Sequence, residues 1–234
     1  MRFAKGFGLR VALPTVLSFG LLSQANAIPM LRLTTSDGGS VTVADGGAGD
    51  LSGAGDGIVI FSGGLGNWIW NIASGFSKPA IGSAVAPELD LNSVNLSSSG
   101  PAGTVNIWLT DTDFSAQTSL ANMMAAIGGT TSGSINYRTF MDAGNTAFGT
   151  TTELTNLSSL SGWAFSSSAG NVFSSPNPYS LTLLVSITHD ASWLPQISSF
   201  DAAVKVPEPG PLLLLGTGLL IAGFAWRRAT RSNR

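Results

Sequence analysis

Short segments with alternating hydrophobic and polar residues recur through the middle of the chain, between clusters of Gly, Ser, Asn and Asp. Because successive side chains of a strand point to opposite faces, this period of two predicts half-buried antiparallel strands. The candidate strands are Leu31 to Thr34, Ser40 to Ala44, Ile58 to Phe61, Trp68 to Ile72, Leu89 to Leu96, Thr104 to Thr110, Ser134 to Met141, Gly162 to Phe165 and Tyr179 to His189. The sequence therefore predicts an all-β domain over residues 28–200, an antiparallel β-sandwich with a jelly-roll-like arrangement.

Two segments depart from this pattern. Ala116 to Ile127 (AQTSLANMMAAI) consists mainly of good helix formers and is followed by Gly128 and Gly129, so it predicts a single helix between strands. Residues 198–206 are too short and too polar to form another domain, so we expect them to link the last strand to the C-terminal end of the chain. We therefore expect the sandwich to end near residue 200, with a linker over residues 201–210.

The first 27 residues have the three parts of a secretory signal peptide. A basic start precedes an apolar stretch over residues 11–22, and Ala25 and Ala27 provide the small residues of a cleavage site. A proline and a glycine within the apolar stretch disfavour the alternative interpretation as a core helix. We expect export by the general secretion machinery, with a mature chain that begins near Ile28.

The other end of the chain combines an apolar run with a basic cluster. Residues 211–226 carry no charge, and Arg227, Arg228 and Arg231 follow them. A helix of this length reaches about 24 Å, somewhat short of the roughly 30 Å hydrocarbon layer of a bilayer. Arginines directly after a span keep that end cytoplasmic. We expect a short transmembrane helix over residues 211–226, a basic cytoplasmic tail over residues 227–234, and the sandwich outside as an ectodomain.

Val206, Pro207, Glu208 and Pro209 precede this apolar span, and the three parts in this order resemble the PEP-CTERM sorting signal over roughly residues 205–231. The resemblance implies recognition by an exosortase-type membrane transpeptidase in bacteria that make exopolysaccharide. It also implies a transient inner-membrane anchor, followed by a place on the cell surface or in the extracellular (biofilm) matrix. Proteins with this tail have diverse outer domains, so the resemblance implies a destination and no particular activity.

Charge is segregated along the chain. Residues 28–205 contain four basic and 12 acidic residues, a formal charge of −8, whereas most basic residues lie at the two ends. An acidic domain repels phosphate backbones, which argues against nucleic acid as a partner. The chain contains no cysteine, which excludes disulfides, thiol nucleophiles and cysteine-ligated zinc.

A glycine-rich acidic stretch contains the candidate metal ligands Asp45, Asp50 and Asp56. Carboxylates are the hard oxygen ligands that calcium prefers, and glycines let backbone carbonyls converge. The match to the calcium-binding nonapeptide repeat is broken, because aspartate here follows glycine directly. Hairpin turns between short strands explain the same residues and are the favoured interpretation.

The tryptophans of the predicted strands divide into two groups. Trp68 and Trp70 share one face of a strand and are expected in the core. Trp108 faces away from its hydrophobic neighbours, beside Asn106 and Thr110. An exposed aromatic ring can stack on a sugar ring, so Trp108 is the candidate glycan contact.

The candidate catalytic residues have simpler interpretations. His189 is the sole histidine, and Asp190 beside it points to the opposite face of a strand, which makes it a poor orienting carboxylate. We interpret His189 as a surface or turn residue. Asp111 and Asp113 have a spacing that a glycosidase pair permits, but a turn or a helix cap explains them better.

These observations predict a non-enzymatic protein of the cell surface or extracellular matrix, without a cofactor, that associates with exopolysaccharide or with the cell surface. Two alternatives stay open. The first is a calcium-dependent surface binding module, and the second is a glycan hydrolase that uses a carboxylate pair.

Overall fold

The computed structural model describes residues 28–115, 120–174, 176–207 and 219. The expected signal peptide, with Ala25 and Ala27, lies outside the described residues, as do Glu208, Pro209 and the basic residues Arg227, Arg228 and Arg231. In the described part of the chain, no helix has the length and apolar character needed to cross a membrane.

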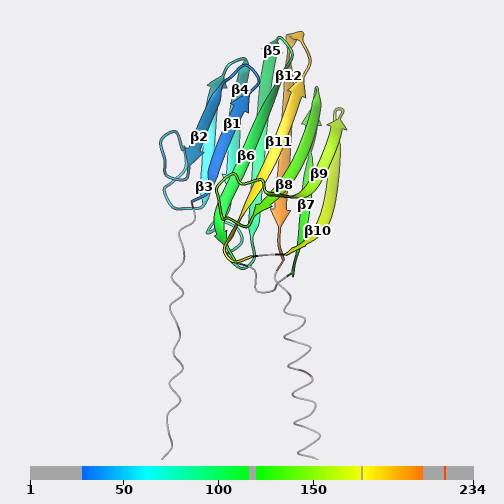
Figure 1. Cartoon of the computed structure of the whole chain (residues 1–234). Coiled ribbons are helices and arrows are strands. Elements are labelled where there is room, and N and C mark those ends of the chain that lie inside the picture. The colour runs from blue at the N-terminus through cyan, green and yellow to red at the C-terminus, as the bar shows by residue number, and fades with distance from the viewer. Residues whose placement is uncertain (1–27, 116–119, 175, 208–218, 220–234) are drawn as a thin grey trace, which may run out of the picture.

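Twelve antiparallel strands form two six-stranded sheets within these described residues. Sheet A has the order β2-β1-β6-β11-β8-β9, and sheet B has the order β10-β7-β12-β5-β4-β3. The strands are β1 (Met30–Thr35), β2 (Ser40–Ala44), β3 (Ile58–Leu65), β4 (Trp68–Phe76), β5 (Glu88–Gly100), β6 (Gly103–Phe114), β7 (Leu120–Thr131), β8 (Ser134–Asp142), β9 (Thr152–Ser161), β10 (Phe165–Ser174), β11 (Tyr179–His189) and β12 (Ser192–Lys205). The two sheets lie face to face (Figure 1), so the all-β sandwich is confirmed.

The last eight strands pair in a nested order. β5 pairs with β12, β6 with β11, β7 with β10 and β8 with β9. This is one long antiparallel ribbon folded over itself, so that its successive strand pairs lie alternately in sheet B and sheet A, which is the connectivity of a jelly roll. Strands β1 to β4 extend the two sheets at one side.

The core lies between the sheets and is supplied by alternate positions of each strand. In sheet A, for example, Leu31 and Leu33 of β1 and Ile107 and Leu109 of β6 are fully buried. Burial of each such side chain stabilises the fold by about 1.5–3 kcal/mol. The remaining positions of the same strands form the outer surface of the sandwich.

The prediction of a helix over residues 116–127 is wrong for residues 120–127, the part of this range that the structure describes. Residues 120–127 belong to strand β7, in which Ala121, Met123, Ala125 and Ile127 are buried and the residues between them are exposed. Alanine and methionine favour helices, but the same segment has a period of two, and pairing with β10 and β12 decides the outcome. Gly129 ends no helix: a Cβ there would overlap the carbonyl oxygen of Ser199 on β12.

The sandwich also extends beyond residue 200. β12 continues to Lys205, so the first five residues of the expected linker are strand. Ser198, Phe200, Ala202 and Val204 are buried at alternate positions, because β12 lies between β5 and β7 near the middle of sheet B. Its small polar residues conceal this pattern in the sequence.

His189 is buried, so its interpretation as a surface or turn residue is wrong. Its side chain is 0% exposed, because it continues the inward-facing positions of β11. Its Nδ1 lies 2.6 Å from Ser98 Oγ and its Nε2 lies 2.8 Å from Ser198 Oγ, both from sheet B. The ring stacks on Trp68, with 4.8 Å between centroids. His189 therefore joins the two sheets.

Burial lowers the pKa of His189 from 6.5 to about 4, although the charge of Asp190 acts in the opposite direction. The unfolded chain therefore binds this proton at a higher pH than the folded protein. We expect the stabilisation from neutral His189 to be complete above about pH 6.5 and to be lost as the pH falls toward 4, by about tenfold in the unfolding equilibrium per pH unit.

Denaturant unfolding between pH 4 and pH 7.5 measures this effect. Asp90, whose pKa is raised to about 6, contributes a slope of opposite sign, so the His189→Gln variant serves as the reference. The difference between wild type and variant cancels the contribution of Asp90. An identical pH dependence in the two proteins would contradict the prediction.

Candidate functional site

A row of large side chains crosses the outer face of sheet A. The register places Arg32 of β1 opposite Trp108 of β6, Trp108 opposite Leu184 of β11, and Leu184 opposite Arg138 of β8. We call these four residues the Trp108 row. Directly opposite residues of antiparallel strands have Cα atoms about 4.5–5.5 Å apart, so the four side chains are neighbours across the sheet. Leu184, between Trp108 and Arg138, is itself buried at 5% exposure.

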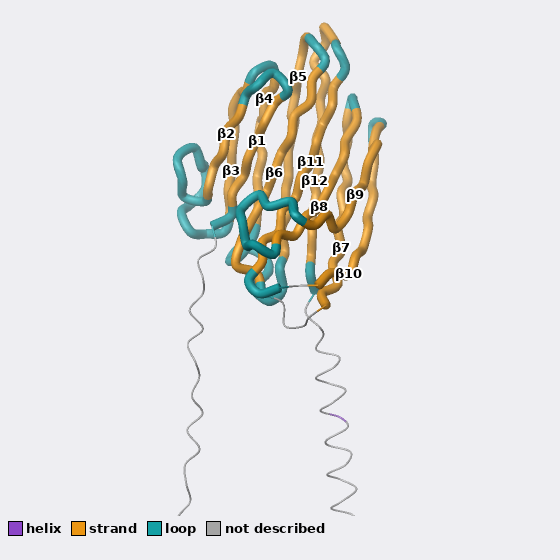
Figure 2. Tube along the Cα trace, viewed as in Figure 1, coloured by secondary structure: helices purple, strands orange, loops and turns teal. Residues whose placement is uncertain are grey.

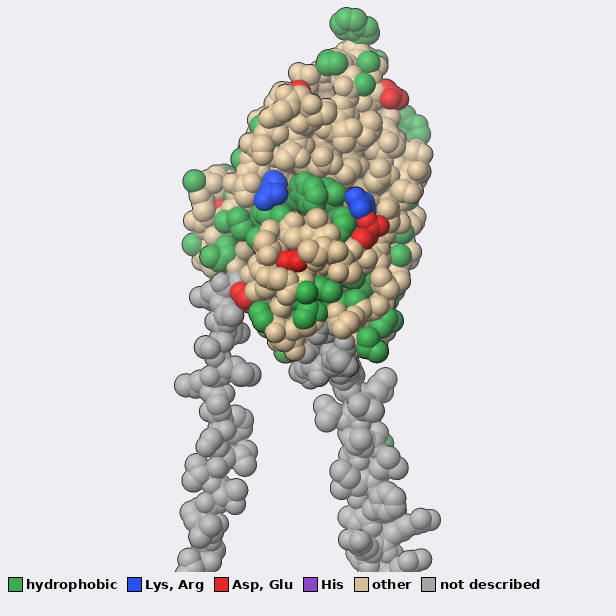
Figure 3. Space-filling model, viewed as in Figure 1, with side chains coloured by type: hydrophobic (Ala, Val, Ile, Leu, Met, Phe, Trp, Pro, Cys, Tyr) green, Lys and Arg blue, Asp and Glu red, His purple; other side chains and the backbone are tan. Residues whose placement is uncertain are grey.

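The core fixes the outward direction of this row. Arg32 lies between buried Leu31 and Leu33, and Trp108 lies between buried Ile107 and Leu109. Alternation then turns Arg32 and Trp108 to the outside, where both are half-buried. Figure 3, in which sheet A faces the viewer, shows two basic patches on either side of an apolar patch on this face.

The loop between β8 and β9, residues 143–151, lies across the outer face next to the row (Figure 2). Phe148 N–H donates to Thr110 Oγ1 on β6 at 3.1 Å, and Ser180 Oγ on β11 donates to the carbonyl oxygen of Thr146 at 2.7 Å. The guanidinium of Arg32 lies over the ring of Phe148, 3.7 Å from its centroid. The loop therefore borders the Trp108 row on one side and leaves its other side open.

A second row, of polar side chains, lies on that open side. Thr34, Asn106, Ser186 and Asn136 are paired across β1, β6, β11 and β8, two residues along each strand from the Trp108 row. We call these the Asn106 row. Ser186 Oγ donates to Asn106 Oδ1 at 2.6 Å. Side-chain amides and hydroxyls can both donate and accept hydrogen bonds, as sugar hydroxyls do.

The basic residues of the domain differ in their partners. Arg138 forms a salt bridge with Glu153 on the outer face of sheet A. Lys205 pairs with Glu88 at 2.5 Å, and Lys78 pairs with buried Asp111 at 2.9 Å. Arg32 forms no ion pair with any described residue. The Trp108 row therefore has one neutralised and one uncompensated arginine.

The other tryptophans are distributed in two ways. Trp68 and Trp70 are buried in the core, as expected. Trp163 is 87% exposed in the connection between β9 and β10, where a strand over Gly162 to Phe165 was expected, and Trp193 is 99% exposed at the start of β12. The row around Trp108 could not be found from sequence, since it depends on the register of four strands.

The acidic glycine-rich stretch forms hydrogen-bonded turns. Asp45 accepts bonds from the N–H groups of Gly55 and Gly57, at 2.7 and 2.9 Å. Asp50 accepts from Gly46 N at 2.8 Å and from Ile60 N at 2.9 Å. Asp56 likewise accepts from two backbone N–H groups. Within the described residues, no group of three or more histidine, aspartate or glutamate side chains could hold a metal ion. The geometry favours the turn interpretation.

Asp111 and Asp113 do not form an open carboxylate pair. Asp111 is 0% exposed, and Ser77 Oγ and Lys78 Nζ donate to its Oδ2. Burial raises the pKa of Asp111, and the charge of Lys78 opposes that rise. Asp113 Oδ1 accepts from Asn145 Nδ2 at 2.6 Å. Asp111 therefore lies in strand β6 as half of a buried ion pair, not in the expected turn or helix cap.

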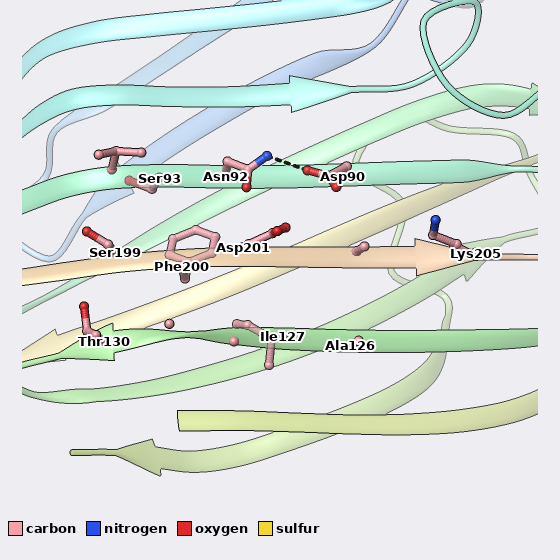
Figure 4. Close-up of a pocket in the computed structure, with 14 residues that line it drawn as sticks. Asp90, Asn92, Ser93, Ala126, Ile127, Thr130, Ser199, Phe200, Asp201 and Lys205 are labelled. Carbon is pink, nitrogen blue, oxygen red and sulfur yellow. Dashed lines mark hydrogen bonds between the residues drawn. The ribbon is translucent and has the colours of Figure 1, made fainter. Parts of the chain in front are cut away.

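The outer face of sheet B has a shallow hollow of about 750 Å³ over β5, β7 and β12 (Figure 4). Ala126, Asp90 and Asp201 are among its lining residues. Burial raises the pKa of Asp90 to about 6, the charge of Asp201 adds to the rise, and the hydrogen bond from Asn92 opposes it. The aromatic residue of the lining, Phe200, is itself buried. The hollow thus has no exposed aromatic ring comparable with Trp108.

Comparison with known proteins identifies the C-terminal end. A family model described as the PEP-CTERM protein-sorting motif matches residues 205–229. The match begins at the last residue of β12, so the motif follows the sandwich directly. The chain thus carries the PEP-CTERM sorting motif, as its resemblance to that signal predicted, and the motif implies export and a place at the cell surface.

No curated protein matches the chain. Among solved structures, TmCBM61 in complex with β-1,4-galactotriose has 9% identity and a TM-score of 0.29, over 76% of this chain and 88% of that chain. The infectious bursal disease virus Gx strain structure has 15% identity and a TM-score of 0.35, over 86% and 55%. The isomalto-dextranase of Arthrobacter globiformis T6, complexed with panose, has 10% identity and a TM-score of 0.19, over 70% and 27%. Scores this low carry no argument about function.

The turn interpretation of Asp50 leads to a test. Asp50→Ala removes an acceptor shared by the N–H groups of Gly46, Ser52 and Ile60, so we expect it to lower the free energy of unfolding by about 1–3 kcal/mol, equally with and without calcium. Thermal unfolding in chelator and in millimolar calcium measures both conditions. Asp190→Ala, at an exposed position, is the control. A calcium-dependent rise in Tm that the Asp50 variant loses would support the metal interpretation instead.

Proposed function

We propose that this protein is a non-enzymatic component of the cell surface or extracellular matrix that binds polysaccharide through the outer face of sheet A. The observation that carries the proposal is the Trp108 row. A half-buried indole, with Arg32 beside it and Arg138 at the far end of the row, bordered by a row of amide and hydroxyl groups, has the two components that hold a sugar polymer.

Each component has a distinct physical role. The face of the Trp108 ring removes the apolar face of a sugar ring from water, and its quadrupole attracts the polarised C–H groups there. The side chains of Asn106, Ser186 and Asn136 exchange hydrogen bonds with sugar hydroxyls. The two rows run across the strands, so a polymer can contact side chains from several strands at once.

The sorting motif supports the destination. We propose that an exosortase-type transpeptidase removes the tail from an inner-membrane intermediate and leaves the sandwich at the cell surface, within reach of exopolysaccharide. Val206 is 4% exposed, and its N–H donates to the carbonyl oxygen of Pro87 at 2.8 Å. Pro207 is exposed. The part of the motif accessible to the enzyme therefore begins at Pro207.

Trp108→Ala tests the binding face. Because large aromatic residues at the centre of an interface contribute about 2 kcal/mol or more, we expect affinity for polysaccharide to fall by roughly 30-fold. Binding to an array of immobilised polysaccharides, including exopolysaccharide from the producing strain, measures the loss. Trp163→Ala and Trp193→Ala remove far more exposed rings outside the row and serve as matched controls. If these variants lose binding and Trp108→Ala retains it, the assigned face is wrong.

Intact-mass measurement of the surface form tests the processing. We expect a chain that begins near Ile28 and lacks residues 211–234, since the apolar span is marginal as a permanent anchor. A Glu208→Gln variant, and a strain without the transpeptidase, should retain the tail in the membrane fraction. Recovery of a surface form that extends to Arg234 in the normal strain would contradict the proposed processing.

A further inference from the structure

We propose that the polysaccharide bound at the Trp108 row is anionic and that Arg32 contacts its acid groups. The inference rests on the proposed function of that face and deepens it by naming the chemical class of the ligand. It is carried by the different pairing of the basic residues in the folded domain, by the position of Arg32 in the row, and by the orientation that Phe148 gives to its guanidinium.

The basic side chains of the folded domain differ in whether a carboxylate pairs with them. In the described part of the chain, Lys78, Arg138 and Lys205 each have a carboxylate partner. Among the described residues Arg32 has neither a carboxylate partner nor a hydrogen bond from its guanidinium, although residues 28–205 contain three times as many acidic as basic residues. A random placement in so acidic a domain would favour a paired arginine. The five N–H donors of Arg32 are therefore available to a ligand.

The contact between Arg32 and Phe148 orients these N–H donors before a ligand binds. The guanidinium lies 3.7 Å from the ring centroid, so the ring covers one face of the planar group. A cation–π contact orients the plane and leaves the in-plane donors unoccupied. Because the side chain is held in place before binding, less conformational entropy is lost when the fork engages an anion. Carboxylate, sulfate and phosphate groups all match this fork.

The neighbours of Arg32 favour the same ligand. Arg32 pairs with Trp108 on one side and with Thr42 of β2 on the other, so no carboxylate lies beside it in the row. At the far end of the row, Arg138 is already neutralised by Glu153. A polymer whose sugar ring stacks on Trp108 therefore presents its substituents to Arg32 at one end, where an acid group meets an uncompensated cation.

Because the domain carries a net negative charge, its preference for acidic polymers depends on Arg32. With a formal charge of −8 over residues 28–205, the sandwich repels a polyanion at long range. Attraction then requires a local contact, since exposed charges separated by more than about 8–10 Å are largely screened at physiological salt. Loss of Arg32 should thus abolish the preference for acidic polymers without abolishing stacking on Trp108.

Two matched pairs of polymers test the inference on the full chain, purified in detergent and applied to immobilised polysaccharide. Polygalacturonate and its methyl ester differ only in free carboxylates, and dextran sulfate and dextran differ only in sulfates. We expect wild type to bind at least one acidic polymer about tenfold or more tightly than its neutral counterpart, and Arg32→Gln to lose that ratio. Arg32→Lys should retain part of it. Lys205→Gln removes an exposed positive charge on sheet B and should leave the ratio unchanged.

The outcomes separate this inference from the proposed function. Equal binding to the acidic and neutral members of both pairs, sensitive to Trp108→Ala, overturns the anionic ligand and retains the binding face. A preference that survives in Arg32→Gln, or that Lys205→Gln removes equally, overturns the role of Arg32. Failure of wild type to bind any of the four polymers overturns the proposed function and the inference with it. Preference for only the carboxylate pair or only the sulfate pair supports the inference and identifies the acid group.

Discussion

The pairing of β6 with β11 is the constraint on which the rest of the structure depends. These strands lie side by side in the middle of sheet A and stay in register from Gly103 and His189 to Asp111 and Leu181. Side chains alternate between faces, so a slip of one residue would turn the core residues to solvent and Trp108 to the interior. The cost of exposing so many apolar side chains fixes the register, and the register in turn assembles the Trp108 row.

The same alternation explains why a weakly charged domain places its few ionisable groups as it does. His189 occupies an inward position on β11 and is accommodated as a neutral ring between two serine hydroxyls. Asp111 occupies an inward position near the end of β6 and requires Lys78 as a partner, since a lone carboxylate is costly to bury. Arg32 occupies an outward position beside the solvent and needs no such partner. Its lack of a carboxylate partner among the described residues therefore costs little stability and leaves its guanidinium free for the proposed binding.

The sequence predicted the sandwich and the core positions of Trp68 and Trp70 because both depend only on local alternation. It failed for β7 and β12, where helix-forming or small polar residues conceal the period of two and pairing with neighbouring strands decides. The burial of His189 was missed for a related reason, since it depends on serines 91 and 9 residues away in sequence. Trp108 was identified as outward-facing, but its neighbours Arg32 and Arg138 come from strands 76 and 30 residues distant and depend on the register. Local patterns thus predict which face a residue occupies, whereas tertiary pairing determines which residues share that face.

The relation between the sandwich and its sorting motif limits how the proposed binding face can be used. The motif match starts at Lys205, at the end of β12, and Val206 is still part of the core, so no flexible spacer separates the fold from the motif. β12 ends at Lys205, where the sorting motif begins, whereas the Trp108 row lies on the outer face of sheet A, part way along the strands. The sorting motif and the Trp108 row therefore lie on different surfaces of the domain. A polymer that crosses the strands also runs roughly perpendicular to them, so the sandwich can hold it without contacting the end from which the tail departs.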